Sequence, residues 1–368
     1  MQSPLPPRLR DLDYARTVLF GLGIVLHSAW LLRHQSPVLQ AVHDVIHSFR
    51  MPGFFVIAGF FSALMLKKYS PREFLVRRVQ RLGLPLITFV AVDIAIDCAN
   101  VYNWTDYSGE LSRDYWISGD WLEYLWFLGT LLSYVVILFA VREIWHSMEA
   151  RVSSLKLKPA FFLVTIALIS FGSAHLERVL PGKPWRNVWL VADQLKFFEY
   201  IGYFIAGYLL FHHRIVLNTL SRQVGWSMAS VALFWVVAPM VGKNLLGGRF
   251  IEFWQAIYCL NVCAILFWCG KQFFSNSETI EKLSNASYTI YLVHWPILVL
   301  LSRIFGNEGI PIALLFLTYV VITSILSYAV HIYVVDRFPL LAFLMNGRPR
   351  AQDQPVAQPG EQVALEST

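Results

Sequence analysis

Long apolar runs recur along the whole chain, and they constrain its fold more than any other feature of the sequence. The composition agrees, because 56% of the residues are hydrophobic and only 15% are charged, against about 45–50% and about 25% in soluble domains. A helix needs about 17–25 mainly apolar residues to cross the hydrocarbon of a bilayer. We therefore predict an all-α, polytopic integral membrane protein with about ten transmembrane helices, over residues 17–32, 45–66, 82–98, 121–141, 160–176, 196–211, 224–242, 250–269, 283–303 and 310–334.

Two of these spans, 17–32 and 196–211, are short or interrupted. Such segments persist in a membrane only when other helices bury them or when they line a cavity. We find no internal repeat, and we expect residues 1–346 to form one transmembrane domain. Residues 347–368 are polar, contain Pro and Gln and have no apolar periodicity, so we expect a disordered cytoplasmic tail there.

Basic residues set the predicted orientation. Most of the 30 Lys and Arg residues fall between alternate apolar runs, whereas the 99–120 loop is acidic. Because Lys and Arg accumulate in cytoplasmic loops, we expect both termini in the cytoplasm. The net charge of +6 is therefore a topology signal and does not indicate nucleic-acid binding. The four cysteines have no metal or redox spacing, so we expect no metal site.

Arg16 and His27 are the first candidate site residues. They lie eleven positions apart, which places both side chains on one helix face and about 16 Å apart along the axis. Arg16 would lie at the cytoplasmic mouth and His27 deep in the membrane. An intramembrane histidine is by default a functional hypothesis, and histidine is the usual general base. The alternative is that His27 only hydrogen-bonds a neighbouring helix.

The second span begins with a further pair of polar residues, His47 and Arg50, which lie one turn apart at its outer end. Arg50 could bind a carboxylate or sugar hydroxyls. The sequence alone favours a different interpretation, in which Arg50 extends to the outer membrane interface. Gly53 and Gly59 would allow another helix to approach closely.

Arg78 and Arg81 lie one turn apart at the cytoplasmic start of the third span. Their position fits ordinary membrane topology, and this is the interpretation that the pair alone favours. Paired guanidinium groups at a helix end also suit phosphate.

A polar ladder occupies one helix face late in the chain, where Tyr288, Tyr291 and His294 are spaced by three. We favour a lined cavity over simple packing for this face. Glu123 and Trp126 share a face of the fourth span, and Trp126 is either a site residue or an interfacial anchor.

These motifs together resemble the acyltransferase-3 family of integral-membrane acyltransferases. "LDYARTVLFGLGIVLH" resembles the family's signature of Arg, ten residues and His, and "FFVIAGFF", "RRVQRLGLPL", "LWFLGTLLSY" and "SYTIYLVHWP" are similar to its further motifs in the same order. The resemblance extends to about residue 346. One departure is Tyr124, which stands where the family often has His before Leu-Trp-Phe.

Within the family, "DVIHSFRMPGFFVIAGFFS", "NASYTIYLVHWP" and "FPLLAFLMNGRP" resemble the branch that succinylates osmoregulated periplasmic glucans. This resemblance implies a multi-pass protein of the inner membrane of a Gram-negative bacterium. It also implies transfer of an acyl group, in that branch succinyl, from cytoplasmic acyl-CoA to a periplasmic glucan, without a permanently bound cofactor. Other glucan-synthesis proteins are possible partners.

The resemblance also implies roles for the candidate residues. Arg16, Arg78 and Arg81 would bind the phosphates of acyl-CoA, and His27 would either deprotonate a sugar hydroxyl or be acylated itself. The acceptor side would be lined by the remaining candidates, His47, Arg50, Trp126, Tyr288, Tyr291 and His294. Two alternatives stay open: an O-acetyltransferase of another surface glycan or glycolipid, and a membrane transporter.

Overall fold

The computed structural model describes residues 10–101, 119–142, 147, 157–179, 194–241, 245–274, 277–306 and 309–347. Helices dominate these residues, and no strand occurs among them. Eight of the helices are long and apolar enough to cross a membrane. The predicted all-α polytopic fold is therefore confirmed, while the number of spans and the side of the termini stay predictions. The predicted tail, residues 347–368, lies outside the described residues except for Gly347.

The first half of the chain supplies three long helices and a broken fourth. They are α1 (Arg10–Leu32), α2 (Pro37–Lys68), α3 (Pro71–Val101) and α5 (Trp126–Ala140). A 3₁₀ turn, η1 (Arg33–Gln35), joins α1 to α2, and another, η2 (Asp120–Leu125), leads directly into α5. The hydroxyl of Ser36 accepts a hydrogen bond from the amide of Leu39 and so caps the start of α2.

The second half contains α7 (Pro159–Val179), α8 (Gln194–His212), the short α9 (Arg214–Arg222), α10 (Val224–Val241), α11 (Leu245–Phe273), α12 (Glu278–Phe305) and α13 (Ile312–Val330). A π-helical turn, η4 (His331–Val335), connects α13 to the last helix, α14 (Pro339–Asn346). Each of the ten predicted spans overlaps a helix of the chain, and residue 242 of the seventh lies outside the described residues. A long apolar run forms a helix because it must satisfy its backbone hydrogen bonds internally in lipid.

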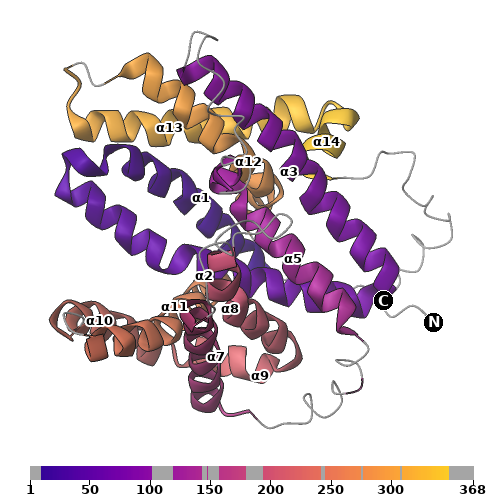
Figure 1. Ribbon diagram of the computed structural model, residues 1–368, viewed down its shortest axis with the longest axis vertical. Coiled ribbons are helices and arrows are strands. Elements are labelled where there is room, and N and C mark those ends of the chain that lie inside the picture. Colours follow the sequence, from indigo (N-terminus) through magenta and orange to yellow (C-terminus); the bar gives the residue numbers. More distant parts are fainter. Residues whose placement is uncertain are drawn as a thin grey trace.

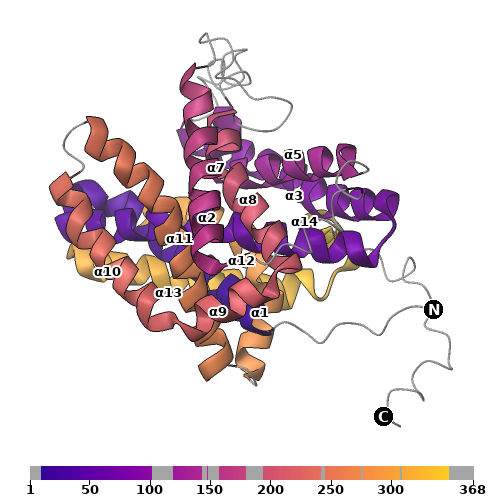
Figure 2. The same ribbon diagram turned by 90° about the horizontal axis from the view of Figure 1, so that it is seen from below.

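Helices from the two ends of the chain lie together at the centre of the molecule (Figure 1). α1 packs against α2, α11 and α12, and α2 packs most extensively against α8. The turned view shows α10 at the periphery beside α11 (Figure 2). In the two spans predicted to need protein around them, in α1 and α8, about half of the residues are buried.

The contact between α2 and α8 depends on two glycines. A Cβ added at Gly59 would lie 2.9 Å from the amide nitrogen of Tyr208, and one at Gly207 would lie 2.6 Å from the carbonyl carbon of Val56. Small residues allow helix backbones to approach closely in a membrane. The predicted role of Gly59 is thus confirmed.

The outer surface of α13 shows the pattern expected of a helix in lipid. Its exposed face carries Leu314, Leu317, Val321 and Ile325, and its buried face carries Thr323 and Ser327 among others. Apolar side chains outside and small polar side chains between helices are the arrangement that lipid favours.

Candidate functional site

A cavity of about 1130 Å³ opens between α1, α2, α3 and α12. Six basic residues line it: Arg16, Lys68, Arg72, Arg77, Arg78 and Arg81. The acidic residue among its lining residues is Glu73, which forms an ion pair with Arg77 at 2.7 Å. The structure therefore brings the three predicted donor-binding arginines into one strongly cationic space, hereafter the basic cavity. Such a space suits a polyanion.

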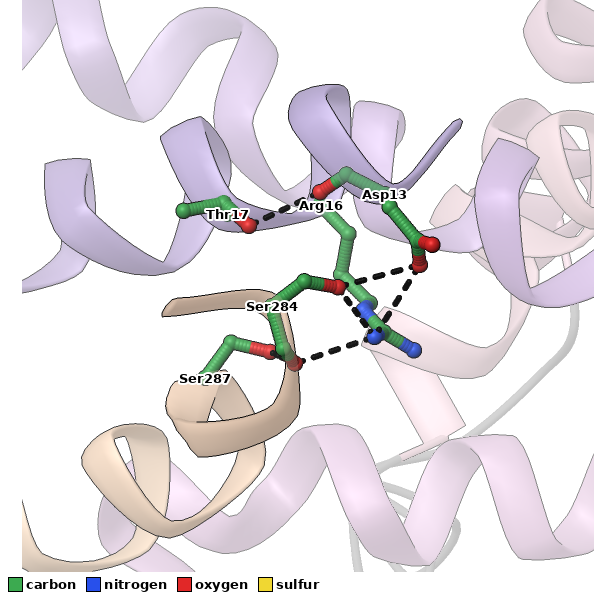
Figure 3. A network of polar contacts seen from close by, with 5 residues as sticks. All are labelled: Asp13, Arg16, Thr17, Ser284 and Ser287. Carbon is green, nitrogen blue, oxygen red and sulfur yellow. Dashed lines mark hydrogen bonds and ion pairs between the residues drawn. The ribbon is translucent and has the colours of Figure 1, made fainter. Parts of the chain in front are cut away.

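Arg16 joins α1 to α12 at the wall of the basic cavity. Its Nη2 donates to the carbonyl oxygen of Ser284 at 3.0 Å and to its Oγ at 2.5 Å, and it lies 3.2 Å from the carboxylate of Asp13 (Figure 3). The hydroxyl of Ser284 donates to the same carboxylate at 3.0 Å. Asp13 and Ser284 were not predicted. Asp13 could have been found from its position one turn before Arg16.

Arg78 is 8% exposed, and its Nη2 donates to Ser62 Oγ at 3.3 Å. Its buried Nε has no hydrogen-bond partner among the described residues. A buried cation without an anionic partner is costly, so a bound anion would stabilise this arginine. Arg81 is held through its main chain, because its carbonyl oxygen accepts the hydroxyl of Tyr288 at 2.7 Å. Tyr288, which we predict to bind the acceptor, thus lines the basic cavity together with these arginines, and its role at the substrate stays a prediction.

Aromatic rings close the inner end of the basic cavity. Phe20, Phe54 and Phe127 line it there, with ring centroids 4.5 Å apart for Phe20–Phe54 and 5.5 Å apart for Phe54–Phe127. Tyr291 lies directly behind them, 5.6 Å from Phe20 and 6.0 Å from Phe127. These four residues are hereafter the aromatic floor.

Two histidines meet on the far side of the aromatic floor. The ring centroids of His27 and His294 are 5.1 Å apart. Nδ1 of His294 donates to the carbonyl oxygen of Tyr291 at 2.5 Å, and its Nε2 is buried without a partner among the described residues. With Nδ1 protonated in this way, Nε2 of a neutral ring carries a free lone pair. The pair therefore offers general-base chemistry.

Arg50 is buried beside this histidine pair. It is 3% exposed, its Nε donates to the carbonyl oxygen of Leu19 at 3.1 Å, and its guanidinium lies over the ring of Phe54. Its Nη2 has no partner among the described residues. The favoured extension to the membrane interface is therefore wrong. Gly23, one turn from His27 on α1, leaves the space that Arg50 occupies, since a Cβ there would lie 2.9 Å from its Cζ.

His47 and Trp126 make ring contacts with residues other than His27 and His294. The His47 ring is exposed and stacks on His43, with centroids 5.4 Å apart and planes 10° apart. Trp126 packs against Tyr200, 5.4 Å away, with the ammonium of Lys196 4.5 Å from its ring centroid. Their predicted roles at the substrate stay predictions.

Sequence reasoning missed two residues that surround His27 and His294. The ring of Trp295 lies 5.3 Å from that of His27, and Tyr124 lies 5.6 Å from His294. The hydroxyl of Tyr124 donates to the carbonyl oxygen of Leu292 at 2.6 Å. The hydroxyl of Tyr291 in turn donates to the carbonyl oxygen of Tyr124 at 2.8 Å. Its place in the Leu-Trp-Phe motif was the available signal.

Glu123 precedes this motif and adopts a backbone that is unusual for a residue with a side chain, with φ of 34°. Its carboxylate accepts a hydrogen bond from the indole of Trp295. Such strain persists only where neighbouring structure imposes it, and here it directs the carboxylate of Glu123 to the ring that packs against His27.

Comparison with known proteins supports an enzyme. A family model described as "Acyltransferase domain" matches residues 9–334. The chain is 27% identical to Glucans biosynthesis protein C of Escherichia coli O139:H28, over 94% of this chain and 97% of the relative. It is 26% identical to the proteins of that name from Salmonella schwarzengrund and Salmonella typhimurium, over 96% and 95% of this chain and 98% and 97% of the relatives. No solved structure matches.

Proposed function

Because the chain belongs to the acyltransferase-3 family of membrane proteins, we propose that it transfers an acyl group from cytoplasmic acyl-CoA to hydroxyls of a periplasmic glucan. The proposed site of action is the bacterial inner membrane. One observation carries this proposal: a basic cavity, the aromatic floor and a histidine pair follow one another along α1 and α12.

The geometry of α1 fits an elongated donor. Arg16 contacts Ser284, Phe20 contacts Tyr291, and His27 contacts His294, so α1 and α12 run parallel. Eleven residues of helix separate Arg16 from His27 by about 16 Å, a length comparable to a pantetheine arm. Phosphates held by Arg16, Arg78 and Arg81 would thus place the thioester near His27.

The reaction would then need a base and a route for the leaving group. A ring nitrogen of His27 accepts the proton of a sugar hydroxyl, and the hydroxyl oxygen attacks the thioester carbonyl carbon. The carbon–sulfur bond breaks, and the CoA thiolate takes up the proton from the imidazolium. Acylation of His27 itself, followed by transfer to the sugar, is the second route that this arrangement allows.

Arg50 supports a donor that carries a free carboxylate. Its guanidinium is buried against Gly23, which lies one turn before His27 on α1. Its Nη2 is without a partner among the described residues. A succinyl group attached through its thioester would present its carboxylate at this depth, and Arg binds carboxylates through charge-assisted hydrogen bonds. The name of the relatives, Glucans biosynthesis protein C, supports glucan as the acceptor.

A mass spectrum of periplasmic glucans tests the proposal. A strain that lacks this activity would carry the native chain, His27→Ala or an empty vector. We expect a succinyl mass on the glucans only with the native chain. Succinylation by His27→Ala at the native level would refute the role of His27. No new mass with the native chain would refute the glucan as acceptor.

A further inference from the structure

The last helix, α14, forms part of the wall of the basic cavity. Phe343, Asn346 and Gly347 line it, and α14 packs beside α3 (Figures 1 and 2). The hydroxyl of Thr88 on α3 donates to the carbonyl oxygen of Leu344 at 3.2 Å. The segment "FPLLAFLMNG", residues 338–347, therefore reaches the candidate donor site.

Gly347 fits directly against the backbone that carries Arg81. It has φ of 58°, which favours glycine, and a Cβ there would lie 2.5 Å from Cα of Arg81 and 2.8 Å from its amide nitrogen. On the other side, Tyr288 donates to the carbonyl oxygen of Arg81. The main chain of Arg81 is thus held between α12 and the end of α14.

A buried polar cluster fixes the end of α14 in this position. The amide of Asn346 donates to Thr289 Oγ1 at 2.9 Å, and the same hydroxyl pairs with Nδ1 of His331 at 2.9 Å. All three side chains are at most 4% exposed. His331 opens the π-helical turn η4, a distortion often found at functional sites. Thr289 also follows Tyr288 directly on α12. The hydrogen bond from Asn346 to Thr289 therefore links the end of α14 to the residue before Thr289, which binds the carbonyl oxygen of Arg81.

We propose that Asn346, Gly347, Thr289 and Tyr288 form a positioning strut, which sets the backbone of Arg81 so that its guanidinium and that of Arg78 bind the donor phosphates together. This inference rests on the proposed function, because it takes the donor to bind in the basic cavity. The strut residues position Arg81, and none of them is assigned a chemical step.

The experiment uses the full chain purified in detergent and measures two independent quantities. One is the binding of CoA, and the other is amide hydrogen exchange in the peptide that contains Gln80, Arg81 and Leu82, measured without CoA. The variants are Gly347→Ala, with Gly309→Ala as control, and Thr289→Val, with Thr289→Ser as the conservative replacement. Gly309 also has positive φ, 72°, but a Cβ there would meet nothing within 4 Å.

We expect Gly347→Ala and Thr289→Val to raise the Kd for CoA about 10- to 150-fold, the loss expected when a hydrogen bond to a charged group is misplaced. Exchange of the Arg81 peptide should be faster in both, and succinyl-CoA kinetics should show KM rising with kcat within about 2-fold. Gly309→Ala and Thr289→Ser should bind CoA as the native chain does.

The outcomes separate the strut from the proposed function. Unchanged exchange in Gly347→Ala and Thr289→Val overturns the strut whatever the donor is. Faster exchange with an unchanged Kd overturns its link to donor binding. If the native chain itself binds no CoA, the proposed function fails. The link between the strut and donor binding then fails as well, even if hydrogen exchange shows that the main chain of Arg81 is restrained.

Discussion

Replacing Gly23 with Ala tests the role of Arg50 without changing Arg50. The new Cβ would lie 2.9 Å from Cζ of Arg50 and closer still to Nη2, so the buried guanidinium must move. A hydrogen bond to a charged group contributes about 1.5–3 kcal/mol, which corresponds to roughly 10- to 150-fold in kcat/KM. We therefore expect Gly23→Ala to lower kcat/KM for succinyl-CoA by roughly 10- to 150-fold and to lower acetyl-CoA transfer much less.

The assay measures transfer of each acyl group to glucan by the purified chain in liposomes. Gly21→Ala is the matched control, because Gly21 lies on the same helix and a Cβ there would meet nothing within 4 Å. Its kcat/KM for both donors should stay within about 2-fold of the native value. Equal losses for succinyl and acetyl donors in Gly23→Ala would refute carboxylate recognition by Arg50. They would indicate instead that Gly23 serves only the packing of α1 near His27.

Three further substitutions test other parts of the structure. Gly207→Ala should destabilise the α2–α8 contact by about 1–3 kcal/mol, measured as a lower thermal midpoint in detergent, whereas Gly225→Ala, which would meet nothing within 4 Å, should not. Phe127→Ala should open the aromatic floor and raise CoA release without acceptor several-fold; an unchanged rate contradicts a barrier role. His294→Ala should raise KM for glucan, while His27→Ala should lower kcat about 10²- to 10⁴-fold; the reverse pattern would exchange their roles.

The helices themselves were predictable because the bilayer leaves few alternatives. A long apolar run must form a helix that satisfies its own backbone, and this requirement acts on each segment separately. The arrangement of the helices was not predictable in the same way. α1 packs against α12, about 270 positions later in the chain, through Arg16 and Ser284. Nothing in an apolar run identifies its partner, because lipid-facing and protein-facing side chains are both apolar.

The candidate site shows the same division. The spacing of Arg16 and His27, and that of Tyr288, Tyr291 and His294, each lies within one helix, so the sequence alone can predict which of these residues share a face. The burial of Arg50 depends on Gly23 in another helix, where the missing side chain provides the space. Local sequence favoured the membrane interface for Arg50 because that choice avoids the cost of burying a charge. Only the tertiary structure shows the carbonyl oxygen and aromatic ring that surround it.

The aromatic floor bears on the choice between an enzyme and a carrier. A carrier must pass its whole solute between the two sides of the membrane. Here the basic residues line the cavity and the histidine pair lies beyond the aromatic floor, so the proposed donor would have its phosphates and its reacting carbonyl on opposite sides of that floor. A donor with a charged head and a narrow arm can meet this arrangement by displacing one or two rings while its head stays in place. A barrier as thin as the aromatic floor, in which Phe20 packs against Tyr291, therefore fits the proposed group transfer better than it fits the passage of a complete polyanion.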